Sequence, residues 1–344
     1  MQNRLQADTL GFRIRTTEIM ILKQRHEQDL RLIASLQGWL VFACTIAFFA
    51  AVPIFFAAYS YPVALFMVYA VVAIGLNILV GFTGQISLGH AGFFAIGAYT
   101  IAKLAPIISF PAALLLSVII CAIVGYLVGI PALKLEGPYL AIATSGFGLA
   151  MQQFFGNTPN SWFGGQGGII LDRSQLFGDF FAKESVYYYI VLVVVALMVF
   201  MGFNLARSHI GRAFVAVRDA ELAAQTSGVN VKQMKTLAFA ISAVYAGVGG
   251  ALFAPLLGIV SPESFSLLLS IQFLSMIVIG GIGTIMGGIL GAGLVTILQD
   301  QLAQAGGWSG LLYGLVVLIV MVLEPLGLYG RWMKIKLYWK TWPF

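Results

Sequence analysis

Long stretches without charged residues alternate along the chain with short stretches in which charges gather. The first charge-free run, residues 32–102, contains no Asp, Glu, Lys or Arg over 71 residues. One membrane-spanning helix needs about 20 apolar residues, so this run must fold back on itself. The pattern predicts an all-α integral membrane protein with about ten transmembrane helices. We place them near residues 38–59, 62–80, 90–108, 111–131, 138–156, 186–205, 237–259, 265–282, 285–299 and 309–324.

The boundary between the eighth and ninth helices is the least defined. Residues 264–299 form one charge-free run of 36 residues, which is compatible with a long helix plus a re-entrant segment. The glycine-rich stretch 280–288 favours a break, because clustered glycines interrupt helices. We therefore predict two helices separated there.

Composition narrows the class of protein. Sixty per cent of the residues are hydrophobic and 9% are charged, against about a quarter charged in an average soluble domain. These values exclude a disordered chain, a coiled coil and most soluble enzymes. The two cysteines, Cys44 and Cys121, lie in apolar runs without metal-binding or redox spacing, so disulfide scaffolding is excluded too.

The net charge of +6 indicates membrane topology rather than a nucleic-acid partner. If the N-terminus is cytoplasmic and the number of spans is even, sixteen of the 19 Lys and Arg residues fall on the cytoplasmic side. Only Lys103, Arg173 and Lys183 fall outside. This asymmetry follows the positive-inside rule and predicts cytoplasmic N- and C-termini, with a basic inner face near anionic membrane lipid.

Polar side chains within the predicted spans are few. They are Asn77, Gln85, His90, Gln152, Gln153 and Gln272. No Asp or Glu lies near the middle of a span, which argues against ion coupling, and only His90 could carry a proton there. The sequence has no P-loop, no HExxH or GxSxG motif and no Cys/His cluster at metal spacing. The chain is therefore expected to be a channel or one part of a multi-chain pump, with no catalytic residue and no metal site of its own.

Glycines form a weak internal repeat pattern, which we call the glycine echo. Gly81, Gly84, Gly89 and Gly92 match four later glycines at a constant offset of 199 residues, namely Gly280, Gly283, Gly288 and Gly291. Small residues let helix backbones approach closely, which is the simplest interpretation. The alternative is a true repeat, whose interrupted helices would lie near a substrate path, as in many transporters.

The longest predicted cytoplasmic loop, residues 206–235, contains a short helix. Phe214, Val217, Glu221 and Ala224 are spaced to share one face, and Gly228 stands where a helix-ending glycine belongs. Small residues (Ala220, Ala223 and Ala224) form a surface beside them. A membrane anchor would need Trp, Phe or Leu there, so a groove on a partner protein suits this surface better.

Four segments together resemble the permease family of ABC importers for branched-chain amino acids, of the LivM type. They are residues 75–99 (GLNILVGFTGQISLGHAGFFAIGAY), 135–148 (LEGPYLAIATSGFG), 211–229 (GRAFVAVRDAELAAQTSGV) and 278–294 (VIGGIGTIMGGILGAGL). The resemblance implies a type II importer permease fold in the bacterial cytoplasmic (inner) membrane. It also implies two ATP-binding subunits, a second permease subunit and a periplasmic substrate-binding protein as partners. No cofactor would bind this chain, and ATP–Mg would bind the ATPase.

By the same resemblance, residues 211–229 correspond to the helix that docks on the ATPase. The motif places that coupling role on Arg218, Glu221, Ala223, Ala224 and Gly228. The glycine segment would line or shape the substrate path through Gly81, Gly84, Gln85, Gly89, His90 and Gly92.

The expected organisation is a basic arm (1–35), a transmembrane permease domain (36–330) and a basic tail (331–344). The outer loop 157–185 is either a flexible connector or a docking surface for the binding protein. Its acidic residues for such docking are Asp172, Asp179 and Glu184.

Two other functions stay open. A passive channel for a small neutral solute such as urea or an amide has no need of the helix near 211–228. A proton-coupled carrier depends on His90 alone. The resembling family also includes permeases for urea, short amides and aromatic acids, and nothing in the sequence separates these substrates.

Overall fold

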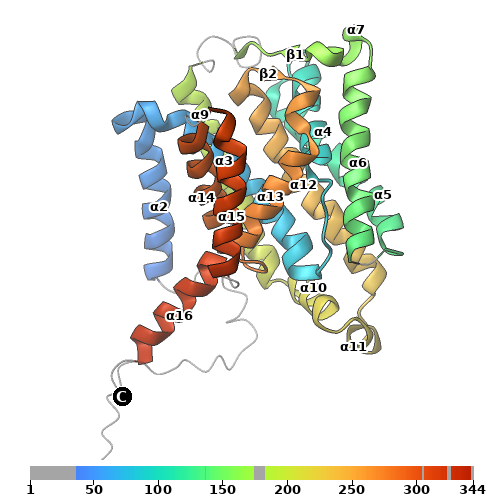
Figure 1. The fold of residues 1–344 in the computed structure, drawn as a ribbon, viewed down its shortest axis with the longest axis vertical. Coiled ribbons are helices and arrows are strands. Elements are labelled where there is room, and N and C mark those ends of the chain that lie inside the picture. The colour runs from blue at the N-terminus through green and yellow to red at the C-terminus, as the bar shows by residue number, and fades with distance from the viewer. Residues whose placement is uncertain (1–35, 136, 174–182, 304–305, 324–326, 342–344) are drawn as a thin grey trace, which may run out of the picture.

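The protein is a bundle of helices in a computed structural model, which describes residues 36–135, 137–173, 183–303, 306–323 and 327–341 (Figure 1). A helix occupies each of the ten apolar stretches. They are α2 (Leu36–Phe55), α3 (Ser60–Asn77), α4 (His90–Leu104), α5 (Phe110–Ala132), α6 (Pro138–Asn157), α9 (Glu184–Arg207), α12 (Val231–Leu257), α13 (Leu267–Gly280), α14 (Ile285–Ala303) and α15 (Ser309–Leu323).

Six helices in the described part of the chain are long and apolar enough to cross a membrane. The all-α membrane architecture is therefore confirmed, whereas the number of ten crossings stays a prediction. The shorter helices include α4 and α13, with 15 and 14 residues. A helix rises 1.5 Å per residue, so neither alone covers the hydrocarbon thickness of about 30 Å.

The buried centre of the bundle is formed by α3, α4 and α12. Glycines let these helices touch, because a methyl group at Gly97 would overlap the carbonyl of Gly247, and one at Gly250 would overlap the carbonyl of Phe94. Helix α5 packs on α12 and turns large aliphatic side chains outward, as a lipid-facing surface requires. They are Leu115, Leu116, Ile119, Ile120, Ile123, Leu127 and Ile130.

The break between α13 and α14 is confirmed. Helix α13 ends at Gly280, and Gly281 and Gly283 take positive φ values of 124° and 83°. Only glycine adopts such angles readily, so the chain turns here. Other boundaries differ from prediction: the third helix ends at Leu104 rather than residue 108, where Pro106 cannot donate a helical hydrogen bond, and α12 begins at Val231 rather than residue 237.

Two short helices and a tail helix complete one end of the bundle. Helices α10 (His209–Asp219) and α11 (Glu221–Thr226) lie at the lower end in Figure 1, and α16 (Gly327–Thr341) extends from the same end. The basic tail thus begins as a helix, which the sequence pattern did not indicate. A π-helical turn, η2 (Ile78–Phe82), continues α3 toward this end.

The opposite end is closed by a folded loop. Helix α7 (Asn160–Phe163) and a 3-10 turn, η3 (Gly165–Gly167), lead to strand β1 (Ile169–Ile170). This strand pairs antiparallel with β2 (Ile259–Val260), directly after α12, and the 3-10 turn η4 (Pro262–Phe265) follows.

Arg173 fixes the continuation of this loop. It donates hydrogen bonds to the carbonyls of Pro255 and Leu256, at 2.6 and 2.9 Å. The described part of this loop, up to Arg173, is therefore held against the end of α12, while the choice between a connector and a docking surface stays a prediction. Of its acidic residues, Glu184 lies in the first turn of α9 and Asp179 lies outside the described residues.

Candidate functional site

The predicted coupling helix is two helices. Helix α10 ends at Asp219, Ala220 is extended with φ −157° and ψ 90°, and α11 starts at Glu221. The prediction of one continuous face from Phe214 to Ala224 is therefore wrong. The break turns α11 toward the start of α12, where Ala224 packs in a small apolar cluster with Val217 and Val231.

Gly228 ends α11 as predicted. Its φ is +85°, its N–H donates to the Gln225 carbonyl at 3.1 Å, and the Val229 N–H donates to the Ala224 carbonyl at 3.0 Å. This pair of bonds is the Schellman arrangement, in which a left-handed glycine satisfies the last carbonyls of a helix.

The small residues predicted to face a partner protein fall into two groups. Ala220 and Ala223 are exposed, whereas Ala224 is only 4% exposed and packs α11 against α10 and α12 within the same chain. The structure adds Leu222, which is 79% exposed on α11. Sequence reasoning missed Leu222, although an aliphatic side chain between Glu221 and two alanines is the signal that could have found it.

Arg218 joins this helix pair to the first glycine turn, which follows α3 and contains Gly81 and Gly84. Its Nη1 donates to the Gly81 carbonyl at 2.6 Å, and its Nε donates to Asp219 at 2.9 Å. The side chain runs past Gly84, where an added Cβ would lie 3.2 Å from the Arg218 Cγ. The guanidinium also faces Gly283, where an added Cβ would lie 3.3 Å from Nη1. A side chain at Gly84 or at Gly283 would therefore crowd Arg218.

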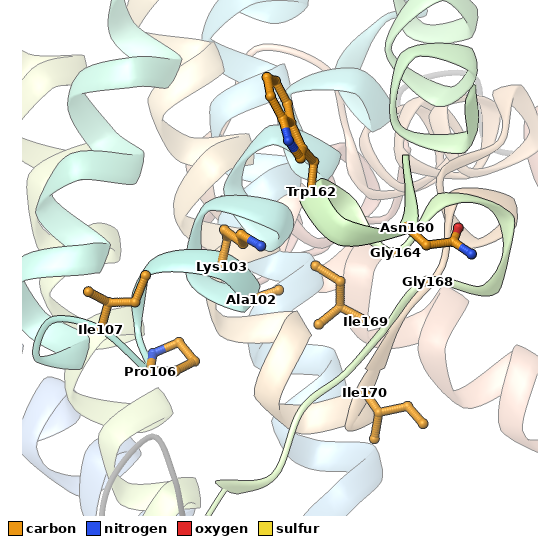
Figure 2. Close-up of a pocket in the computed structure, with 10 residues that line it drawn as sticks. All are labelled: Ala102, Lys103, Pro106, Ile107, Asn160, Trp162, Gly164, Gly168, Ile169 and Ile170. Carbon is orange, nitrogen blue, oxygen red and sulfur yellow. The ribbon is translucent and has the colours of Figure 1, made fainter. Parts of the chain in front are cut away.

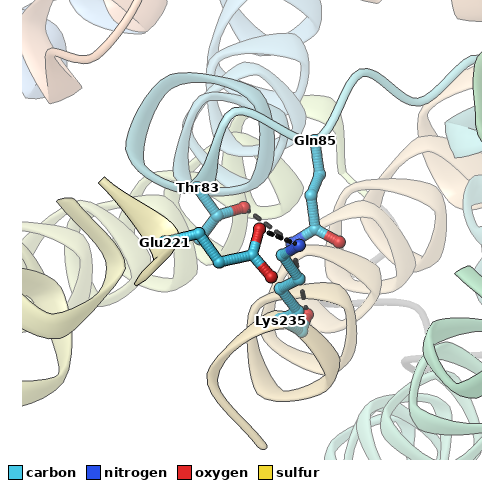
Figure 3. A network of polar contacts seen from close by, with 4 residues as sticks. All are labelled: Thr83, Gln85, Glu221 and Lys235. Atoms are coloured by element: carbon cyan, nitrogen blue, oxygen red, sulfur yellow. Dashed lines mark hydrogen bonds and ion pairs between the residues drawn. The ribbon is translucent and has the colours of Figure 1, made fainter. Parts of the chain in front are cut away.

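A second connection runs through Glu221 and the start of α12 (Figure 3). The Lys235 ammonium lies 2.6 Å from the Glu221 carboxylate. Gln85 donates to the Thr83 hydroxyl at 2.8 Å and reaches the Lys235 carbonyl at 3.4 Å. The structure thus brings coupling residues and glycine-segment residues into one site, which we call the glycine-turn site.

Asn77, in α3, holds the first glycine turn against the second, which lies between α13 and α14 and contains Gly281 and Gly283. Its amide donates to the carbonyls of Gly281 and Thr284 at 3.3 and 2.7 Å, and its Oδ1 accepts the Gly283 N–H at 2.7 Å. Asn77 is fully buried, and a methyl group at Gly81 would overlap its Oδ1. Its isolated polarity in an apolar span was visible in the sequence, but its role was not.

The remaining predicted path residues pack inside the chain. A side chain at Gly89 would overlap the Thr144 carbonyl, and one at Gly92 would meet the Phe147 ring at 2.9 Å. His90 is buried, with Nδ1 3.2 Å from the Ser87 hydroxyl and Nε2 2.6 Å from the Ser242 hydroxyl. These contacts agree with hydrogen-bonded packing, and the lining of a substrate path stays a prediction.

Comparison with known proteins bears on the whole of this region. The family described as "Branched-chain amino acid transport system / permease component" matches residues 58–323, which include α3 to α15 and the complete glycine-turn site. The chain belongs to this family. The permease is therefore a membrane subunit of a transport system and not an enzyme.

Individual relatives agree with the family. The permease is 34% identical over 287 residues to the high-affinity branched-chain amino acid transport system permease protein LivM of Salmonella typhimurium, covering 76% of this chain and 68% of that one. The LivM protein of Escherichia coli strain K12 gives the same identity and coverage. BraD of Pseudomonas aeruginosa, also a branched-chain amino acid permease protein by name, is 28% identical over 76% of this chain and 92% of its own. No solved structure is significantly similar to the chain.

Proposed function

We propose that the permease is the membrane-spanning subunit of an ATP-driven importer that takes branched-chain or other hydrophobic amino acids from a periplasmic binding protein. The names of LivM and BraD support this substrate class. In this proposal the chain crosses the bacterial inner membrane ten times, with both termini in the cytoplasm. It works with two ATP-binding subunits and a second permease subunit, and the ATPase holds ATP–Mg.

One observation carries the proposal: an exposed helix pair is tied by side chains to the interior of the bundle. Leu222 and Ala223 on α11 offer a small apolar surface to a partner, while Arg218 connects the same segment to the Gly81 carbonyl and Glu221 connects it to Lys235 of α12. A passive channel has no need of such a connection. An ATPase that moves α10 and α11 would pull on the Gly81 carbonyl and on α12 at the same time.

The π-helical turn η2 is where such a pull would act. Gly81 lies within it, and beyond it the N–H groups of Gly84 and Gln85 donate to the carbonyls of Val80 and Leu79 at 3.1 and 3.3 Å. Single π-helical turns are common at functional sites in helices. A shift of this turn would carry with it the α13–α14 turn, since Asn77 fastens the two.

The test uses Leu222, which is largely exposed. Leu222→Asp places a charge on the proposed docking surface, and Leu222→Met keeps the surface apolar. We expect the Asp variant to lose co-purification with the ATP-binding subunits and ATP-driven leucine uptake in proteoliposomes, with normal membrane insertion. The Met variant should retain both. Leucine uptake that proceeds without ATP and without the ATP-binding subunits would refute the importer and favour the passive channel.

A further inference from the structure

The two ends of the bundle present different surfaces. At the end with the β1–β2 pair, a hollow of about 550 Å³ is lined mainly by apolar residues and glycine (Figure 2). Lys103, the one charged side chain among its ten lining residues, already interacts within the chain. At the other end, α16 presents aromatic and basic side chains that are exposed. A partner is therefore to be sought at α16.

The first turn of α16 belongs to the bundle. Gly327 is buried with a φ of +70°, and a Cβ added there would lie 2.6 Å from the Gly281 Cα in the second glycine turn. Leu328 packs on the hydrophobic core. The helix therefore starts in close contact with the turn between α13 and α14.

The rest of α16 leaves the bundle. From residue 331 to residue 339, every side chain that the structure describes is exposed, and in Figure 1 the helix runs away from α10 and α11. Trp332, Ile335 and Trp339 are 62%, 44% and 71% exposed. Their spacing of three and four residues places them on one face of the helix. This aromatic row continues the face on which Leu328, four residues before Trp332, meets the core.

The preceding helix indicates what lies beside this row. Helix α15 exposes one line of aliphatic side chains by half or more, namely Leu311, Leu315, Leu318 and Val322. Such a surface suits the hydrocarbon chains of lipid. Residues 301–323 contain no charge, whereas Glu324 and the basic residues of the tail follow directly. The chain therefore reaches the membrane surface where α16 begins, and tryptophan is enriched at that depth.

The charges of α16 have one sign. After Glu324 the chain has four basic residues and no Asp or Glu. Lys336 lies one turn after Trp332 and so flanks the aromatic row, and it forms no ion pair with any residue that the structure describes. Lys334 is two residues earlier, which is a rotation of about 200° around the helix axis. The two exposed lysines therefore lie on nearly opposite sides of the helix.

We propose that α16 lies in the membrane interface and binds an anionic phospholipid, whose phosphate pairs with Lys336 while Trp332, Ile335 and Trp339 enter the region below the headgroups. A lysine side chain can reach a headgroup while its stem stays on apolar surface. The choice of a lipid over an acidic protein rests on the aliphatic line that α15 exposes directly before this helix. The site needs neither ATP nor a transported solute, so it stands independently of the function proposed above.

The test measures which lipid lies beside α16 in the full-length permease. Nanodiscs are made from equal amounts of phosphatidylcholine and phosphatidylglycerol, and only one of the two lipids carries bromine, which quenches nearby tryptophan, on its acyl chains close to the headgroup. Each permease is measured with and without the paired substitutions Trp332→Phe and Trp339→Phe, so that the difference is the signal of α16. We expect an about fivefold preference for phosphatidylglycerol, which corresponds to about 1 kcal/mol for one basic residue at an anionic surface.

Two lysines of the same helix separate a lipid site from general attraction of charge. Lys336→Gln should remove the preference, and Lys336→Arg should keep it. Lys334→Gln removes the same charge from the far side of the helix and is the matched control, which should also keep the preference. Bromine should quench the signal of α16 in every variant, because the aromatic row is unchanged.

Three outcomes would overturn the proposal. Equal quenching by the two brominated lipids would exclude selection of the anionic one. An equal loss of preference in Lys334→Gln and Lys336→Gln would replace the site with a diffuse attraction to the basic tail. A signal of α16 that neither brominated lipid quenches would place the helix away from the membrane and favour an acidic protein as its partner.

Discussion

The hydrogen bond from the Arg218 guanidinium to the Gly81 carbonyl gives the sharpest prediction. Arg218→Met keeps most of the side-chain length and removes the donor to the Gly81 carbonyl, which lies 2.6 Å away. A hydrogen bond to a charged group contributes about 1.5–3 kcal/mol, and because the Arg218 side chain is 37% exposed we take the lower end. About 1.4 kcal/mol corresponds to a factor of ten in an equilibrium, so the link between α10 and the glycine turns should weaken about tenfold.

The assay measures leucine uptake and ATP hydrolysis in the same proteoliposomes. We expect the amount of leucine carried per ATP to fall up to about tenfold in Arg218→Met, while the ATP-binding subunits remain associated, because the exposed face of α11 is unchanged. Arg212→Met is the control, since Arg212 lies on α10 and, among the described residues, donates to the Arg207 carbonyl at the end of α9 and to His209 rather than to a glycine turn. An Arg218→Met transporter with the wild-type ratio would refute transmission through this contact.

Two further predictions concern the same site. Glu221→Lys places two ammonium groups together and should abolish uptake in whole cells. If the 2.6 Å ion pair between Glu221 and Lys235 is what matters, the double variant Glu221→Lys with Lys235→Glu should recover part of the uptake. A double variant as inactive as the single one would contradict the pairing. Gly92→Val should abolish uptake, because the branched side chain meets Phe147 and overpacking costs about 1–3 kcal/mol. Gly314→Val, with open space at its position, should keep most of the uptake, and so should His90→Gln. If His90→Gln eliminates uptake and a proton gradient proves necessary, the proton-coupled carrier replaces the importer.

The helices themselves were predictable because the membrane simplifies the pattern. Lipid excludes charge, so charge-free runs mark the spans, and the glycines at 280–288 mark the break that the structure has at Gly281 and Gly283. The start of α12 was missed because its first turn, with Lys232, Gln233 and Lys235, is polar and lies beyond the apolar run. Helix α16 was missed for the same reason.

The kink at Ala220 could not be predicted from local preference. Alanine, glutamate and leucine favour helix on both sides of it, so propensity alone continues the helix. The extended backbone at Ala220 accompanies the burial of Ala224 against Val217 and Val231. Tertiary packing of this kind involves residues whose proximity the sequence does not state.

The contacts of the glycine-turn site show the same limit more strongly. Arg218 and Gly81 are 137 residues apart, and Asn77 and Thr284 are 207 apart. Each was noticeable alone, as a motif position, a glycine or a polar residue in a span. Their convergence is a property of the folded chain.

The glycine echo acquires a physical meaning from this convergence. Gly84 and Gly283, which are 199 residues apart, both take left-handed backbone, with φ values of +72° and +83°, and both lie against Arg218. The echo is not symmetric, however, because Met276 stands 199 residues after Asn77, and only Asn77 bridges the turns. Packing and function were alternative interpretations of these glycines in the sequence. In the structure the two interpretations meet at the same residues: a side chain at Gly81 would overlap the Asn77 amide, and side chains at Gly84 and Gly283 would crowd Arg218, which itself donates to the Gly81 carbonyl.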